Sequence, residues 1–209
     1  LEESDRWRLR SPSLLVLGFG TQFLDAELDG LPDLIVANGH IDDYGGQEPL
    51  EMQPQYYRNV GRRFAEWPAA RLGPFFTRKY LGRGLALIDY NRDGREDFVV
   101  SHIGAKAALV ENRSANPGHF LAVDLVATRS ARDGFATRVT VEAGRFRRVR
   151  QLVAGSGYQA SNERQLVFGL GKHERIDRLT VRWPSGKEEV YEGLAVDRRV
   201  KLVELRGLW

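Results

Sequence analysis

The sequence predicts an all-β protein whose second half is an antiparallel β-sandwich, and three observations support this fold class. Hydrophobic residues make up 42% of the 209 residues, which is enough for a packed core. Two similar segments each place an acidic, glycine-containing loop between apolar, β-branched runs that are typical of strands. From residue 119 onward, short runs of near-alternating polarity lie between clusters of turn residues.

The second half contains six expected strands at spacings that suit a sandwich. They cover residues 120–126, 138–141, 165–168, 179–183, 188–191 and 200–203. Pro184-Ser185-Gly186 supplies a hairpin turn between two of them. Trp183 and Tyr158 could line a sugar site, but a strand tryptophan beside such a turn is more often buried in a core.

Charge is distributed unevenly and indicates a domain boundary. Residues 1–118 carry a net charge of −3 and residues 119–209 carry +6. Asn116-Pro117-Gly118 supplies turn chemistry at the change. We therefore expect two domains, residues 1–117 and 118–209. The arginines between 145 and 150 would alternate between the two faces of a strand, so no continuous basic stripe for nucleic acid is expected.

Several classes of protein are disfavoured by composition. Cysteine is absent, which removes disulfides and thiol chemistry. No apolar run approaches the roughly 18 residues of a membrane span. The four histidines stand apart without a nucleophile or metalloprotease motif. We therefore predict no catalytic residue, no organic cofactor and no enzymatic activity. Because the chain begins with Leu1, we expect a piece of a longer protein whose targeting segment is missing.

An internal repeat lies in the first half. Residues 18–36 superpose on residues 82–100 at an offset of 64 without a gap. Seven positions are identical in the two copies, and in the first copy they are Gly18, Gly20, Asp25, Asp29, Gly30, Asp33 and Val36.

Each copy contains a nine-residue loop of the D-x-[DN]-x-D-G-x-x-D type, with Glu27 at the third position of the first copy. Calcium is a hard cation that takes six to eight oxygen ligands, and glycine at the sixth position permits the sharp turn around it. The side chains at positions 1, 3, 5 and 9 and the carbonyl at position 7 are the candidate Ca²⁺ ligands. In the first loop these are Asp25, Glu27, Asp29, the Leu31 carbonyl and Asp33. In the second they are Asp89, Asn91, Asp93, the Arg95 carbonyl and Asp97.

Two alternatives compete with a calcium loop between strands. An EF-hand requires glutamate at position 12 and flanking helices, but Val36 and Val100 occupy that position, so an EF-hand is rejected. Asp, Asn and Gly also form metal-free hairpin turns. Two loops in register, each with its final aspartate, favour calcium. Glu27 is longer than the usual residue at position 3, and Arg92 and Arg95 weaken the second loop electrostatically.

With these residues in view, each repeat resembles an FG-GAP/VCBS blade, the unit of integrin-type β-propellers. Residues 38–41 and 57–64 resemble the stretches that follow the loop in that family. From about residue 119 to 204 the chain resembles the ASPIC/UnbV domain, which follows such blades in secreted bacterial proteins and in cartilage acidic protein. The matching stretches are residues 127–134, 136–141, 155–163, 168–171 and 181–186.

The resemblance implies a partial β-propeller followed by the sandwich, acting outside the cytoplasm as a secreted, periplasmic or cell-surface protein. Asn59 and Asn112 lie 53 residues apart rather than 64, so the first blade has about 11 extra residues, expected at 42–53. Two blades cannot close a ring, so an exposed edge is expected unless the sandwich or a second copy of the chain covers it.

The predicted function is a calcium-binding module for an unidentified protein or glycan ligand, with calcium structural rather than catalytic. The alternative is part of a polysaccharide lyase or hydrolase, with its active site in missing blades or at the domain junction. A converging set of ionisable side chains would favour the enzyme, and the sequence shows none.

Overall fold

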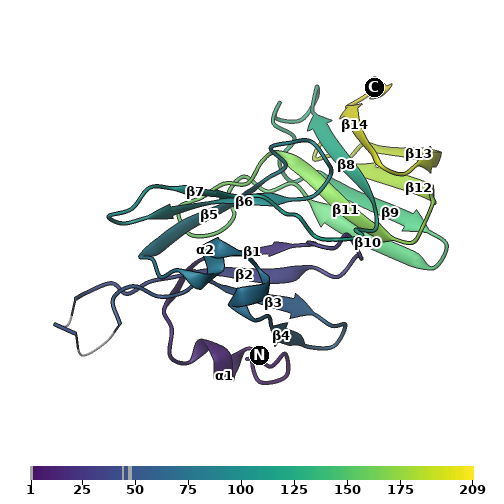
Figure 1. The fold of residues 1–209 in the computed structure, drawn as a ribbon. Helices are drawn as coiled ribbons and strands as arrows, with labels where there is room; N and C mark the ends of the chain where they lie inside the picture. The colour runs from purple at the N-terminus through teal and green to yellow at the C-terminus, as the bar shows by residue number, and fades with distance from the viewer. Residues whose placement is uncertain (1, 44, 47–48) are drawn as a thin grey trace.

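The structure is a computed structural model that describes residues 2–43, 45–46 and 49–209 (Figure 1). It is an all-β protein with several largely antiparallel sheets, none of which is closed. The helical segments are single turns at Arg10–Ser13 (α1), Ala69–Arg71 (η1) and Pro74–Thr77 (α2). The all-β prediction is therefore confirmed.

The first sheet is a four-stranded antiparallel meander in chain order. Its strands are β1 (Gly18–Leu24), β2 (Asp33–Asn38), β3 (Gln55–Asn59) and β4 (Phe64–Glu66). The second sheet repeats the first three strands as β5 (Gly82–Ile88), β6 (Asp97–His102) and β7 (Ala108–Val110). The bounds of β5 and β6 are those of β1 and β2 shifted by 64 residues, so each acidic loop joins two strands, as predicted.

The extra residues of the first copy lie between its second and third strands. Residues 39–54 connect β2 to β3, whereas residues 103–107 make the corresponding connection between β6 and β7. This difference is the 11 residues inferred from the spacing of the two asparagines. Residues 44, 47 and 48 of the expected 42–53 loop lie outside the described part of the chain.

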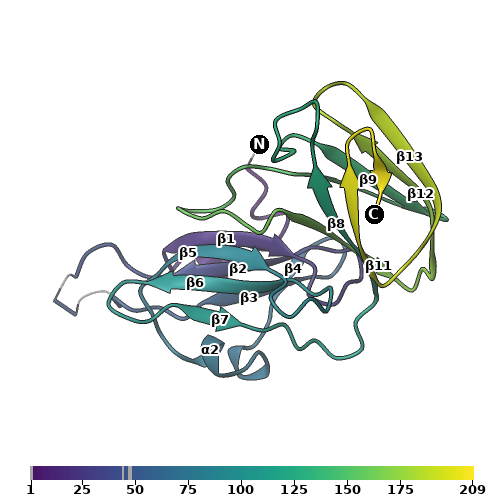
Figure 2. The ribbon, with the colours of Figure 1, turned by 90° about the horizontal axis from the view of Figure 1, so that it is seen from above.

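The first two sheets share one core. Ile35 of β2, Tyr56 of β3, Leu85 of β5 and Val100 of β6 are buried together against Phe76 of α2. Strands β1 and β5 pack side by side (Figure 2). They approach so closely that a Cβ atom on Gly20 would lie 2.5 Å from the Arg83 carbonyl oxygen, which explains why glycine occupies this position.

The second half forms two facing sheets. One has the order β10-β9-β12-β13 and the other the order β11-β8-β14-β15. The strands are β8 (His119–Val126), β9 (Arg138–Ala143), β10 (Phe146–Gln151), β11 (Gln165–Gly171), β12 (Arg175–Arg182), β13 (Glu188–Ala195), β14 (Arg198–Val203) and β15 (Gly207–Leu208). One buried core with residues from both sheets lies between them, including Val123, Val141 and Leu179.

Two details of this half bear on the sequence predictions. Gly186 N donates to the Trp183 carbonyl in the predicted 184–186 hairpin, and the Trp183 side chain is 1% exposed in the core, which rules out a sugar-stacking role. The expectation of a wholly antiparallel sandwich is wrong, because β14 pairs with β8 in parallel. The chain crosses from one sheet to the other after β13 and enters beside β8 in the same direction, instead of turning back in a hairpin.

Candidate metal-binding loops

Each acidic loop is a tight turn held together by its first carboxylate. Asp25 is 1% exposed. Its Oδ1 accepts a hydrogen bond from Asp29 N at 2.9 Å, and its Oδ2 accepts one from Gly30 N at 2.8 Å. Asp89 accepts the two equivalent hydrogen bonds in the second loop, both at 3.1 Å. The sixth residue of each loop has φ of +85°, which glycine adopts without strain.

The last aspartate of each loop ties it to the next strand. Asp33 Oδ1 accepts a hydrogen bond from Asn59 N at 2.7 Å, and Oδ2 accepts one from the Tyr56 hydroxyl at 2.6 Å. In the second loop, Asp97 Oδ1 accepts a hydrogen bond from Asn112 N at 2.6 Å. Each loop therefore fixes the position of the third strand of its own sheet.

Residues at the middle positions make contacts within the loop. Asn91 Oδ1 accepts a hydrogen bond from Asp93 N at 3.2 Å. The N–H of Leu31 donates to Asp29 at 2.8 Å, and the N–H of Arg95 donates to Asp93 at 3.0 Å. These contacts keep the predicted ligands of each loop within one turn of chain.

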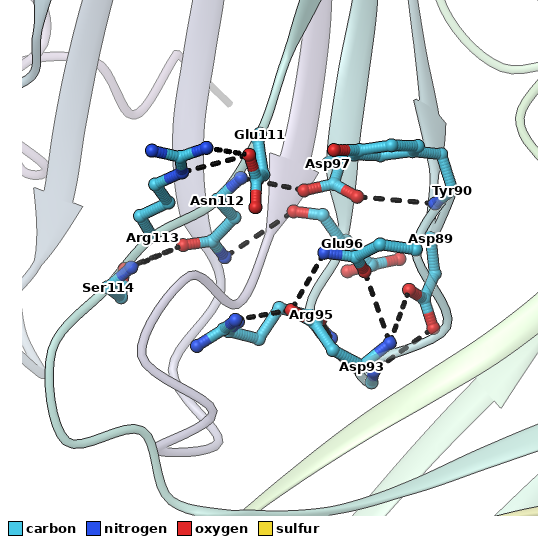
Figure 3. Close-up of polar contacts among 12 residues, drawn as sticks. Asp89, Tyr90, Asp93, Arg95, Glu96, Asp97, Glu111, Asn112, Arg113 and Ser114 are labelled. Atoms are coloured by element: carbon cyan, nitrogen blue, oxygen red, sulfur yellow. Dashed lines mark hydrogen bonds and ion pairs between the residues drawn. The ribbon is translucent and has the colours of Figure 1, made fainter.

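In each loop, an arginine pairs with one of the predicted metal ligands. In the second loop the Arg95 guanidinium pairs with Asp93 (Figure 3). Although burial opposes the change, this partner lowers the pKa of the Asp93 carboxyl. In the first loop Arg58 Nε lies 3.4 Å from Glu27 Oε1. Both arginines compete with a metal ion for these carboxylates.

Three buried loop carboxyls, those of Asp25, Asp33 and Asp97, are held in an environment that disfavours their charge. Burial raises the pKa of Asp25 to about 6, that of Asp33 to about 7 and that of Asp97 to about 6. Neighbouring acids add to the effect, with Asp29 acting on Asp25 and Glu27 acting on Asp33. A bound cation favours the charged forms and would reverse these shifts.

The donor set fits a hard divalent cation in chemistry but is not fully gathered. Both loops offer only carboxylate, amide and carbonyl oxygens, which calcium prefers. Within the described ranges, no group of three or more acidic or histidine side chains is arranged to hold a metal ion. Binding would therefore require Arg95 to release Asp93 and Arg58 to release Glu27.

The packing of both loops against the sandwich was not predicted from the sequence. Leu28, the fourth residue of the first loop, is 1% exposed and packs with Ala122 and Val167. Its carbonyl oxygen accepts a hydrogen bond from Gly171 N at 2.8 Å. The available signal was that Leu28 stands at the position where the second loop has Arg92.

The second loop contacts the sandwich through Glu163. Glu163 Oε2 accepts a hydrogen bond from Asp89 N at 3.0 Å, and Oε1 pairs with Arg92. A Cβ atom on Gly94 would lie 2.3 Å from the Phe120 ring. Only glycine therefore fits at this position, for packing as well as for backbone conformation.

A segment of the sandwich, residues 156–163, covers the free edge of β5. Glu163 N donates to the Leu87 carbonyl at 2.9 Å, and Asn162 Oδ1 accepts a hydrogen bond from Leu87 N at 2.9 Å. Gln22 on β1 donates to the Ser156 carbonyl at 2.9 Å and accepts a hydrogen bond from Asn162 Nδ2 at 3.0 Å. The sandwich is thus one of the two covers that the sequence suggested for an exposed edge.

The glycines show that this segment takes the place of a neighbouring strand. Gly20 on β1 lies against Arg83 and Leu85 of β5, whereas its counterpart Gly84 lies against the backbone oxygens of Tyr158 and Gln159. Beside β5, the segment therefore occupies the position that β5 occupies beside β1.

Comparison with known families identifies part of the second half. Residues 127–207 match the family model described as ASPIC and UnbV, so the sandwich contains an ASPIC/UnbV domain, as the sequence motifs suggested. No curated protein matches the chain. In the part of the chain that the structure describes, no helix is long and apolar enough to cross a membrane.

Proposed function

We propose that this chain is a calcium-stiffened binding module in which two FG-GAP/VCBS-type blades precede the ASPIC/UnbV domain. The observation that carries the proposal is the pair of strand–loop–strand units with buried carboxylates at matching positions. Asp25 and Asp89 are 1% and 3% exposed, and Asp33 and Asp97 are 1% and 0% exposed. These carboxylates accept hydrogen bonds but have no cationic partner of their own among the described contacts, and a buried negative charge is costly unless a cation shares it.

The blade assignment is supported by strand order. A four-stranded antiparallel meander is the usual unit of a β-propeller, and the first sheet has this order. The second sheet has the first three strands of the same meander. Residues 156–163 lie where the innermost strand of a further blade would be placed.

Calcium in this proposal has a structural role. Neither loop has the bidentate glutamate of a high-affinity site, so we expect dissociation constants on the order of 10⁻⁴–10⁻³ M. At millimolar calcium, tenfold above the tighter constant, one site stabilises the fold by about 1.4 kcal/mol. Such affinity suits a secreted, periplasmic or cell-surface location, where the module would bind a protein or a glycan.

Thermal unfolding tests the calcium proposal. We expect the melting temperature to be about 4 °C higher per occupied site in millimolar calcium than in EGTA. Asp93→Ala should remove part of this difference, because it deletes a ligand of the second loop. The matched control is Asp133→Ala, which removes an exposed acid outside the loops. Equal melting temperatures in calcium and EGTA would show that both loops are metal-free turns.

The choice between a binding module and an enzyme part has its own test. The intact protein is screened against a glycan panel for both retention and product release. Retention without product supports binding, and cleavage of any sugar would replace the proposal with the lyase or hydrolase alternative.

A further inference from the structure

A groove of about 610 Å³ lies between the first sheet and strand β10 of the sandwich. Its size falls in the range of small-molecule sites, roughly 300–1,000 Å³. One wall is aromatic: Trp7 and Phe64 have ring centroids 5.6 Å apart, and Phe23 lies 6.3 Å from Phe64. Phe23, on β1, is 57% exposed. An exposed aromatic face of this kind is available for a ligand.

The opposite wall carries two arginines on β10. The Nε atom of Arg148 donates to the Gly30 carbonyl at 3.0 Å, and its guanidinium lies 5.0 Å from the Phe146 ring centroid. Arg150 Nη1 lies 3.5 Å from Glu96 Oε1. Within the described residues, the Nη2 groups of Arg148 and Arg150 have no hydrogen-bond acceptor. Both side chains are therefore held in place, and the Nη2 group of each can donate a hydrogen bond to a ligand.

The charge that the groove presents to a ligand is positive. Asp25 is the acid in its lining, but its side chain is buried and both of its oxygens accept backbone hydrogen bonds. A ligand that matches this surface combines a flat apolar ring system with one anionic group, because arginine donors pair well with carboxylate or sulfonate oxygens.

We propose that this groove binds a small aromatic anion, with its rings against Phe23 and Phe64 and its anionic group on Arg148 and Arg150. None of these four side chains is a predicted metal ligand, although the first loop contributes Asp25 and Gly30 to the lining of the groove.

The test uses the full chain and 8-anilinonaphthalene-1-sulfonate, an aromatic anion, with the uncharged N-phenyl-1-naphthylamine as its matched probe. Fluorescence titration and calorimetry should show one saturable site per chain. We expect the anion to bind at least about tenfold more tightly than the neutral probe, because a charge-assisted hydrogen bond is worth at least that factor. Arg148→Gln should remove most of this difference.

The matched control is Arg147→Gln, the adjacent arginine, which is exposed and pairs with Glu142 outside the groove. It should leave both affinities unchanged. Since Arg148 also holds Gly30, a second variant, Phe23→Ala, removes an exposed ring without disturbing a core and should weaken both probes severalfold. Equal affinity for the two probes, several weak sites, or unchanged binding in Phe23→Ala would each overturn the proposal.

Discussion

Glu204, which follows β14, links the residues after β8 to the hairpin turn at 184–186. Its side chain is 0% exposed, and its carboxylate accepts hydrogen bonds from three consecutive backbone N–H groups, those of Thr128, Arg129 and Ser130, at 2.7–3.0 Å. Ser185 in the hairpin turn donates to the same carboxylate. Although burial opposes it, these donors lower the pKa of Glu204 to about 2. A sequence motif does not reveal this contact, because the three backbone partners lie about 75 residues away.

Glu204→Gln tests this role. The substitution removes the negative charge while keeping the shape, and we expect the free energy of unfolding at neutral pH to fall by about 2 kcal/mol, the value for hydrogen bonds to a charged group. Because the folded-state pKa lies below the unfolded value of about 4.3, the contribution of Glu204 is present above that pH and is lost as the pH falls towards 2. Urea unfolding at several pH values measures both effects.

The matched control for this substitution is Glu192→Gln, an exposed glutamate on β13. It should leave the unfolding curve unchanged. A loss in Glu204→Gln that persists undiminished at about pH 2 would contradict an origin in the ionised carboxylate.

At the scale of the elements, the loops and strands were predictable because their signals are local. The spacing of acids and glycine predicted two strand–loop–strand units, and the structure gives β1 and β2, and then β5 and β6, around them. The hairpin at 184–186 has an equally local signal. The parallel pairing of β14 with β8 was not predicted. The direction of β14 relative to its neighbour depends on which sheet the chain enters after β13. The residues next to β14 in the sequence do not indicate which sheet the strand joins.

The loops also predict how stability depends on pH in the absence of calcium. Since burial raises the pKa values of Asp25, Asp33 and Asp97 to about 6 to 7, the folded state holds more protons than the unfolded state above about pH 4. The stability from these groups is fully present below that pH and is lost as the pH rises through 6 to 7. In EGTA, we expect the melting temperature to be higher at about pH 5 than at about pH 8.

Asp25→Asn isolates the source of this pH dependence, since the amide cannot titrate. The difference between the two pH values should become smaller in Asp25→Asn and should remain in Asp133→Asn, an exposed acid outside the loops. Calcium should also reduce the difference, because a bound cation favours the charged carboxylates. A larger pH difference in Asp25→Asn than in the parent chain would refute this explanation.

At the scale of the whole molecule, residues of the two acidic loops pack against the sandwich and join the two halves. Leu28 inserts between Ala122 and Val167, and Gly94 packs on Phe120. Sequence analysis separated the halves by charge but did not reveal this contact. Leu28 lies about 90 to 140 positions from Ala122 and Val167, Gly94 and Phe120 belong to different halves, and each residue has an ordinary identity for its own element.

Leu28→Ala tests whether the junction contributes to global stability. Removing a buried leucine side chain costs about 3 kcal/mol, including the cavity that remains. We expect this loss in urea unfolding, with fluorescence and circular dichroism reporting the same transition because both halves unfold together. Leu15→Ala is the control, since Leu15 is 86% exposed. An unchanged midpoint in Leu28→Ala would mean that the halves are stabilised independently.

The cover that residues 156–163 place on β5 has a consequence for dissecting the protein. Composition and turn chemistry suggest cutting the chain near residue 117, yet such a cut would strip β5 of the groups that satisfy its Leu87 backbone. An amino-terminal fragment would then expose the unpaired backbone N–H and C=O groups of the β5 edge, which can pair with other copies of the fragment. We therefore expect the fragment to precipitate on expression. Adding residues 156–163 as a separate peptide should keep that fragment in solution, which light scattering would record.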